Sequence, residues 1–218
     1  MTPDYARAAA AASETLIKYA ISSAPVDPLP VLKKYPGVLV VSYQDFSDDV
    51  QQDRACLISM FGDNQDAFTT VYMVSGQPHY LVTYNARLPI YIIQRALARE
   101  LGHIVLRHDG SLPEDVRNEE AKAFSHYFLI PRALIHAVRS AGLPVTPEIL
   151  HNLTGCNDYC LSCLGRLPAV SVSPDLNRAV RDQFHRYVSE YLLFHRSAAL
   201  HHAGAPADLG SYMEGYEE

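Results

Sequence analysis

The chain has few of the features that mark membrane, secreted or nucleic-acid-binding proteins. Its longest uncharged apolar stretches are far shorter than the roughly 20 residues that a membrane-spanning helix needs. The first residues lack the basic, apolar and small-residue order of a signal peptide, and lysine and arginine form no cluster. The formal net charge is −6, and a broad nucleic-acid surface needs clustered cations. We therefore expect a cytoplasmic protein without a membrane or a nucleic acid as its direct partner.

Cysteine is also scarce, and its spacing supports no strong metal site. Of four cysteines, Cys156, Cys160 and Cys163 are close together and Cys56 is far away. Their spacing resembles the cluster loop of radical S-adenosylmethionine enzymes, but it also places them on one face of a short predicted helix, where small apolar side chains pack in a core. A zinc site that adds His151 would lack paired Cys-x-x-Cys knuckles. We expect Cys160 and Cys163 to be reduced, buried and free of metal.

Length and composition predict a real hydrophobic core. The chain has 218 residues, of which 48% are hydrophobic, and this suits one domain or one domain with a helical annex. Strand-like segments come first and helices follow, an order that favours an α+β fold over alternating βαβ units. We expect a small, mostly antiparallel sheet, arranged as a meander and packed on a helical core.

The predicted elements follow from local patterns. Segments rich in β-branched and aromatic residues predict strands at 38–43, 55–61, 68–75 and 79–84. Helical spacing predicts helices at 7–22, from 90 to the Asp109-Gly110 pair, from Pro113 to Pro131, and at 175–199. The last helix has an apolar face of Leu176, Ala179, Val180, Phe184, Val188, Tyr191 and Leu192. We divide the chain into a main domain (1–142), a helical C-terminal extension (143–204) and a flexible tail (205–218).

The chemistry of the chain centres on residues 99–103, which read Arg-Glu-Leu-Gly-His. This is the zinc-peptidase motif His-Glu-x-x-His with arginine in place of the first histidine. In the intact motif two imidazoles hold the metal, and the glutamate takes a proton from the metal-bound water. Glu100 and His103 remain, but Arg99 has no free lone pair and a fixed positive charge, so it cannot ligate a dication. The sequence predicts a hydrolase scaffold without its first metal ligand.

A second motif follows on the next predicted helix. Residues 119–125 read Glu-Glu-Ala-Lys-Ala-Phe-Ser, and apolar residues lead on to Pro131. A Glu-Leu-Gly-His helix followed by this pattern resembles the ImmA/IrrE family of metallopeptidases, over residues 5–167 and most specifically over 96–131. The resemblance implies a zincin-like fold, zinc as cofactor if the protein is active, Glu100 as catalytic base, and His103 and Glu120 as metal ligands. It also implies a protein partner, a helix-turn-helix repressor of a prophage, mobile element or stress regulon.

The resemblance also suggests where a substrate would lie. In zinc peptidases of this general shape, an edge strand above the active-site helix holds the substrate chain by strand addition. The segment 79–84 directly precedes the motif helix. We expect it to be that edge strand.

The motif residues also have purely structural interpretations. A buried Glu100 needs a donor such as Arg99, Arg95 or a backbone group, and such a pairing alone would explain it. His103 taken alone fits a core histidine. A glycine inside a helix costs up to about 1 kcal/mol, so Gly102 predicts the close approach of another element.

Two further histidines are candidates for the lost ligand. His108 lies five residues past His103, which is roughly 140° round an ideal helix. His126 lies six residues past Glu120, again on the wrong side. Only a frayed helix end would bring His108 nearer, so neither is expected to replace the ligand. Glu119 fits a solvated helix face.

Two function classes follow, and a third is weaker. The first is an active zinc metalloendopeptidase that cleaves such a repressor with an altered ligand set, although catalytic zinc normally has three protein ligands. The second is a degenerate peptidase fold that acts as a regulatory or binding protein, and the third is a toxin–antitoxin-like partner with a vestigial cleft. We favour the second, with the Arg99 guanidinium in the place of the zinc and paired with Glu120.

Overall fold

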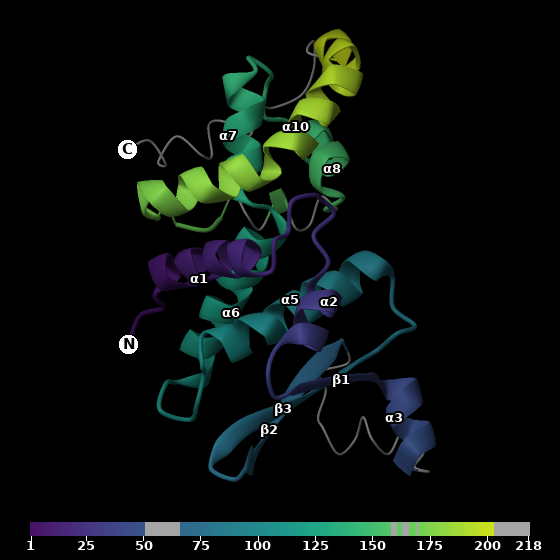
Figure 1. The fold of residues 1–218 in the computed structure, drawn as a ribbon, viewed down its shortest axis with the longest axis vertical. Coiled ribbons are helices and arrows are strands. Elements are labelled where there is room, and N and C mark those ends of the chain that lie inside the picture. The colour runs from purple at the N-terminus through teal and green to yellow at the C-terminus, as the bar shows by residue number, and fades with distance from the viewer. Residues whose placement is uncertain (51–65, 158–160, 163–165, 169, 203–218) are drawn as a thin grey trace.

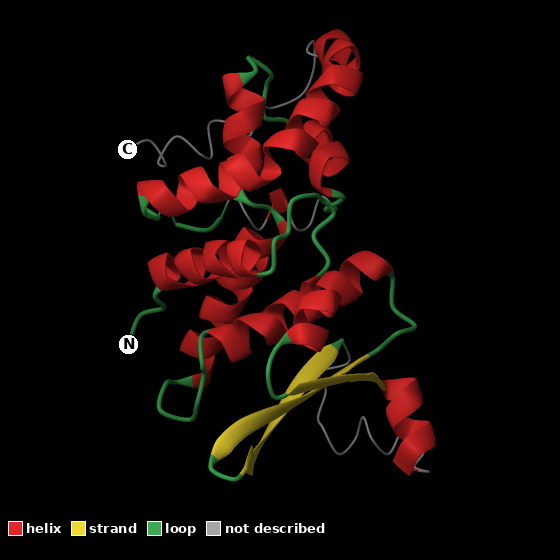
Figure 2. Ribbon diagram, in the orientation of Figure 1, coloured by secondary structure: helices red, strands yellow, loops and turns green. Residues whose placement is uncertain are grey.

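The computed structural model describes residues 1–50, 66–157, 161–162, 166–168 and 170–202. The strand expected at 55–61, the tail, and the side chains of Cys56, Cys160 and Cys163 lie outside these residues. The described chain is an α+β fold in which a small sheet lies at one end of a helical body (Figures 1 and 2). Among the described residues, no helix is long and apolar enough to cross a membrane.

The N-terminal part contributes two helices that are capped by aspartates. In α1 (Tyr5–Lys18) the Asp4 carboxylate accepts a hydrogen bond from the Arg7 amide at 2.9 Å, and in α2 (Pro28–Lys34) Asp27 has the same role toward Leu29. The helix expected at 7–22 ends earlier, at Lys18, because Ala20 has a left-handed backbone (φ +53°).

The sheet has three described strands in the order β1-β3-β2. β2 (Ala67–Val74) and β3 (Gln77–Tyr84) form an antiparallel hairpin, and β1 (Val38–Ser42) pairs with β3 in parallel. The hairpin turns at Ser75 and Gly76, which both have positive φ, as a tight hairpin turn with right-handed strand twist requires. Three of the predicted strands are therefore confirmed in position.

Two expectations about the sheet are wrong. The described strands form a mixed sheet and no meander, because β1 enters beside β3 instead of beside β2. The segment predicted as an edge strand is β3, which lies in the centre with a neighbour on each side, and β2 is at the edge of the described sheet. The order of the strands in the sequence does not reveal that β3 is central and β2 is at the edge. α3 (Tyr43–Val50) and further chain separate β1 from the hairpin, so β1 can pair with either of its strands.

The two motif helices form the middle of the molecule. α5 (Ile90–Val105) lies against the sheet and α2 on one side and against α6 (Glu114–Leu129) on the other. A Cβ built on Gly102 would lie 3.0 Å from Phe124 Cδ1 and 3.1 Å from the Ala121 carbonyl oxygen. The predicted close approach at Gly102 is thus confirmed, and α6 is the element concerned.

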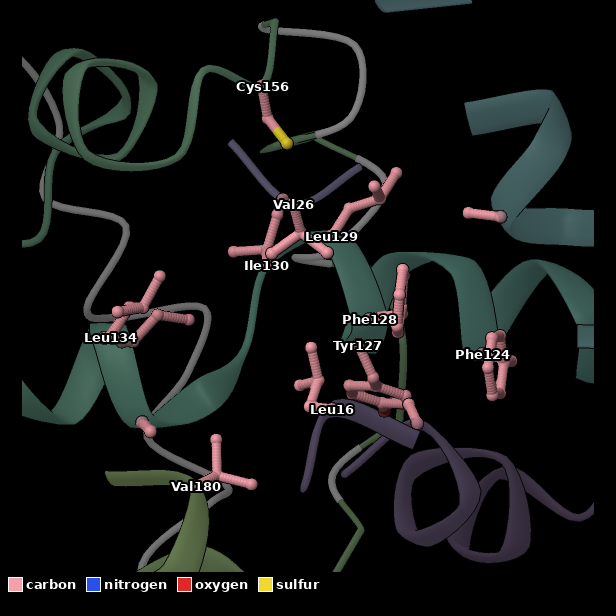
Figure 3. Packing of buried hydrophobic residues seen from close by; sticks show 14 of the residues in the cluster. Leu16, Val26, Phe124, Tyr127, Phe128, Leu129, Ile130, Leu134, Cys156 and Val180 are labelled. Atoms are coloured by element: carbon pink, nitrogen blue, oxygen red, sulfur yellow. The ribbon is translucent and has the colours of Figure 1, made fainter. Parts of the chain in front are cut away.

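The helical body is completed by α7 (Arg132–Ser140), α8 (Pro147–Thr154) and the long α10 (Pro174–His202). α10 packs on α1 and α7, with Val180, Phe184, Val188 and Tyr191 buried as expected, whereas Ala179 is exposed. One contiguous core joins these helices, and Figure 3 shows side chains of α6 close to Leu16 of α1 within it. Cys156 is buried in this core.

Candidate functional site

The site begins where α5 ends. The helix stops at Val105, four residues before the predicted stop, and Arg107 takes a left-handed conformation (φ +53°). The Arg107 amide donates to the Ile104 carbonyl at 3.1 Å and the His108 amide donates to the His103 carbonyl at 3.0 Å. These two bonds form a Schellman motif, which reverses the chain at a helix end. As a result His108 folds back onto the helix and lies beside His103.

His108 links the two expected metal ligands. Its Nδ1 lies 2.9 Å from His103 Nδ1, and its Nε2 lies 3.0 Å from Glu120 Oε2. The His108 and Glu120 side chains are only 1% and 3% exposed. The pKa of His103 is lowered to about 3. Burial is the largest cause, and the neighbouring His108, Arg99 and Arg117 lower it further. Burial also lowers the pKa of His108, while its hydrogen bond to Glu120 opposes that shift.

The Glu120 carboxylate is held from three directions. Besides His108, the backbone amide of Asp4 donates to Oε1 at 2.8 Å and Arg7 Nη1 lies 3.5 Å from Oε2. Arg7 also donates to the carbonyl of Leu106 at the end of α5. A buried carboxylate is tolerated only when donors replace its lost water. The N-terminal residues therefore supply part of the site, which the motif pattern does not reveal.

Glu100 has a separate set of donors. Arg99 Nη2 lies 3.1 Å from Oε1, and Thr69 Oγ1 on β2 donates to Oε2 at 2.8 Å. Glu100 is only 4% exposed, and this burial raises the pKa of Glu100 although Arg99 and Thr69 oppose the shift. The prediction that Arg99 pairs with Glu120 is wrong, because its guanidinium is engaged by its sequence neighbour. The alternative interpretation, that Glu100 is paired with Arg99, is confirmed.

These residues do not form a metal centre of the peptidase type. Within the described residues, no group of three or more His, Cys, Asp or Glu side chains is placed to hold a metal ion. His103 and Glu120 both contact the His108 ring, at Nδ1 and Nε2 respectively. Arg99 supplies no lone pair at the third position. The donor set therefore does not fit a catalytic zinc ion.

Sequence reasoning located some of the site and missed the rest. It identified Glu100, His103 and Glu120, which the structure brings into two neighbouring hydrogen-bonded groups around α5. His108 was only a minor candidate, because the angle of roughly 140° from His103 holds only if the helix continues beyond Val105. The usual signal for an earlier stop is a glycine at the left-handed position, and here an arginine occupies it.

Two hollows flank this part of the fold. A pocket of about 250 Å³ between α5 and α6 is lined by Arg95, Arg99, Lys122 and the buried His126, among others. A larger groove of about 850 Å³ lies between the β2–β3 hairpin and the chain that follows α5, and His108 forms part of its wall. The site is thus connected to a surface groove on the side of the hairpin.

The fold and the motif helices define the class of the chain, which is a metallopeptidase-like α+β fold of the zincin type. Comparison with known families agrees, because residues 63–144 match the family described as the IrrE N-terminal-like domain. This part of the chain is therefore similar to a domain of the ImmA/IrrE family. Neither a curated protein nor a solved structure matches the chain.

Proposed function

We propose that the chain is a non-catalytic member of the ImmA/IrrE family that regulates a helix-turn-helix repressor by binding it. The observation that carries the proposal is the contact between Arg99 and Glu100, in which the would-be catalytic base is bound at 3.1 Å by the side chain that replaces a metal ligand. A guanidinium is a permanent cation with donors only. It can neutralise the glutamate that remains when the metal is lost.

The expected chemistry of the site supports this proposal. In zinc peptidases the glutamate acts on a metal-bound water, whose pKa the metal lowers to about 7. In this chain Glu100 accepts hydrogen bonds from Arg99 and Thr69. His103 and Glu120 are joined through His108. Every group that would hold or activate such a water has a partner within the protein.

The partner follows from the family and not from the site. The ImmA/IrrE resemblance implies a protein that acts on a helix-turn-helix repressor, and a fold that keeps its groove but loses its metal can still bind that protein. The competing function is an active zinc metalloendopeptidase that cleaves the repressor with an altered ligand set. The two differ in whether the repressor stays intact.

The test combines metal analysis with a repressor assay. Purified full-length protein, with and without added zinc, is analysed for metal and incubated with the helix-turn-helix repressor encoded nearest to its gene. We expect substoichiometric zinc, an intact repressor and a complex detectable by calorimetry. Stoichiometric zinc with repressor cleavage would overturn the proposal in favour of the peptidase, and an intact repressor without a complex would overturn the binding role.

A pair of variants sharpens the metal measurement. Arg99→His restores the first motif histidine, so its zinc content should rise above that of the wild type. Arg95→His is the matched control, because Arg95 lies one helical turn earlier and pairs with Asp66 at 3.4 Å instead of Glu100. It should bind no additional zinc.

A further inference from the structure

The β2–β3 hairpin presents an apolar surface beside the site. On its inner face Thr69 lies opposite Val82, and this level is covered by α5, since Val82 is fully buried and Thr69 contacts Glu100. The next residues on the same face of β2 are Val71 and Met73, because side chains alternate along a strand. They are 53% and 64% exposed. α5 therefore covers the inner face of the hairpin at the level of Thr69 and Val82, and the same face is exposed at the level of Val71 and Met73.

This exposed end of the hairpin forms the floor of the groove of about 850 Å³. The register places Val71 opposite Tyr80 and Met73 opposite Pro78, and all four line the groove. Ile104 at the end of α5 lies on the other side. A groove of this volume is within the range of roughly 300–1,000 Å³ that is typical of binding pockets.

The walls of the groove are basic in a chain whose net charge is −6. Lys18, Arg107 and Arg117 line it, and Asp109 is the one carboxylate among the described lining residues. The Nε atom of Arg117 is buried and has no hydrogen-bond partner among the described residues. A buried donor without a partner costs free energy that an incoming acceptor would recover.

We propose that this groove binds an extended segment of a partner protein in which acidic residues alternate with apolar ones. The apolar side chains would cover Val71 and Met73, and the carboxylates would meet Arg107, Arg117 and Lys18. Complementary charge sets orientation and selects the partner, while the buried apolar area supplies most of the affinity. The proposal rests on the proposed function and specifies the chemistry that the partner must present. A nucleic acid fits less well, because the floor is aliphatic and cations are few.

The test uses a fluorescein-labelled peptide of sequence Glu-Leu-Glu-Phe-Glu-Leu and a counterpart with lysine in place of each glutamate. Fluorescence anisotropy with the full chain should show at least tenfold tighter binding of the acidic peptide. Met73→Asp and Arg107→Glu should each weaken that binding at least tenfold. Both residues are exposed, so the variants are expected to fold, and circular dichroism verifies this.

The chain offers a matched control for each variant. Val74 is next to Met73, is 44% exposed and does not line the groove, so Val74→Asp should bind the peptide as the wild type does. Arg87 is an exposed arginine outside the groove, and Arg87→Glu should also be silent.

Several outcomes would overturn the inference. The acidic and basic peptides could bind equally well, or Met73→Asp could bind the acidic peptide as tightly as the wild type does. A single-stranded oligonucleotide could displace the peptide, or the wild type could form a dimer that Met73→Asp dissociates.

The repressor assay is scored separately. If the repressor is cleaved while the peptide binds in the groove, the non-catalytic function fails and this inference stands. If the repressor binds intact and Met73→Asp does not affect either ligand, only this inference fails.

Discussion

His108 Nε2 lies 3.0 Å from Glu120 Oε2, and both side chains are almost fully buried. The imidazole thereby links Glu120 to His103, whose Nδ1 lies 2.9 Å from His108 Nδ1. The contact depends on the reversal of the chain after α5, because an uninterrupted helix would carry His108 away from His103. A side chain that sequence periodicity excludes is therefore central to the site.

The His108 link should be needed for stability. Removing one partner of a buried charged hydrogen bond leaves the other unsatisfied, which typically costs about 3 kcal/mol. His108→Ala should cost roughly 2 kcal/mol, because Asp4 and Arg7 still contact Glu120. Urea unfolding of the variant and the wild type measures this loss of unfolding free energy. His185→Ala, at an exposed position on α10, should change stability by less than about 0.5 kcal/mol; an equal loss in both variants would refute the role of the link.

Arg99→Ala should destabilise the fold in a manner that depends on pH. The variant leaves Glu100 buried without its cation, at a cost of about 2 kcal/mol at pH 7. Burial already raises the pKa of Glu100, and removal of Arg99, which opposes that shift, should raise it further. A carboxyl with a raised folded pKa destabilises the fold fully above that value, and this penalty disappears as the pH falls from it toward the ordinary value of 4.5.

The loss in Arg99→Ala should therefore be larger at pH 7 than at pH 4.5. Denaturant titrations at both pH values measure the difference. The double variant Arg99→Ala/Glu100→Gln supplies the control, because a neutral amide needs no cation. If the double variant is as unstable as the single one at pH 7, the pair is not the cause.

Gly102→Ala should destabilise the protein although alanine favours helix formation by about 1 kcal/mol. The added Cβ would lie 3.0 Å from Phe124 and 3.1 Å from the Ala121 carbonyl oxygen, so α5 and α6 must separate. Overpacking of this kind typically costs about 1–3 kcal/mol. Thermal unfolding reports the change. A Cβ on Gly110 meets nothing within 4 Å, so Gly110→Ala should be close to neutral; a stabilised Gly102→Ala would show that the helices are not in close contact.

The buried His126 should make the fold sensitive to acid. Burial, and then Lys122 and Arg95, lower the pKa of His126 to about 4 from the ordinary value of 6.5. The unfolded chain therefore binds the proton first, so the stability from the neutral ring is complete above pH 6.5 and is lost as the pH falls toward 4. The loss amounts to roughly 3 kcal/mol.

A neutral replacement tests this contribution. His126→Gln should flatten the fall in unfolding free energy between pH 6.5 and 4, as measured by urea titration at several pH values. His185→Gln changes an exposed histidine and should leave the slope as in the wild type. Parallel pH profiles for wild type and His126→Gln would contradict the assignment.

Most local elements of this protein could be predicted from the chain alone. Periodicity and turn residues located the helices α6 and α10 and the strands β1, β2 and β3, and they located α5 except for its last turn, which ends at Val105. The need for a close neighbour at Gly102 could also be read from one residue. These features depend on residues near one another in the chain, where side-chain spacing and backbone preference act directly.

The interaction partners of the site residues and of the strands depend on tertiary packing. Arg99 binds Glu100 and leaves Glu120 to Asp4, Arg7 and His108. β1 pairs with β3 in parallel, which places β2 at the edge of the described sheet. Apart from the contact between the neighbours Arg99 and Glu100, each outcome joins residues that are far apart in the chain or depends on a single left-handed residue at a helix end. Which donor reaches a buried carboxylate depends on how all the surrounding elements pack, and a one-dimensional pattern does not contain that information.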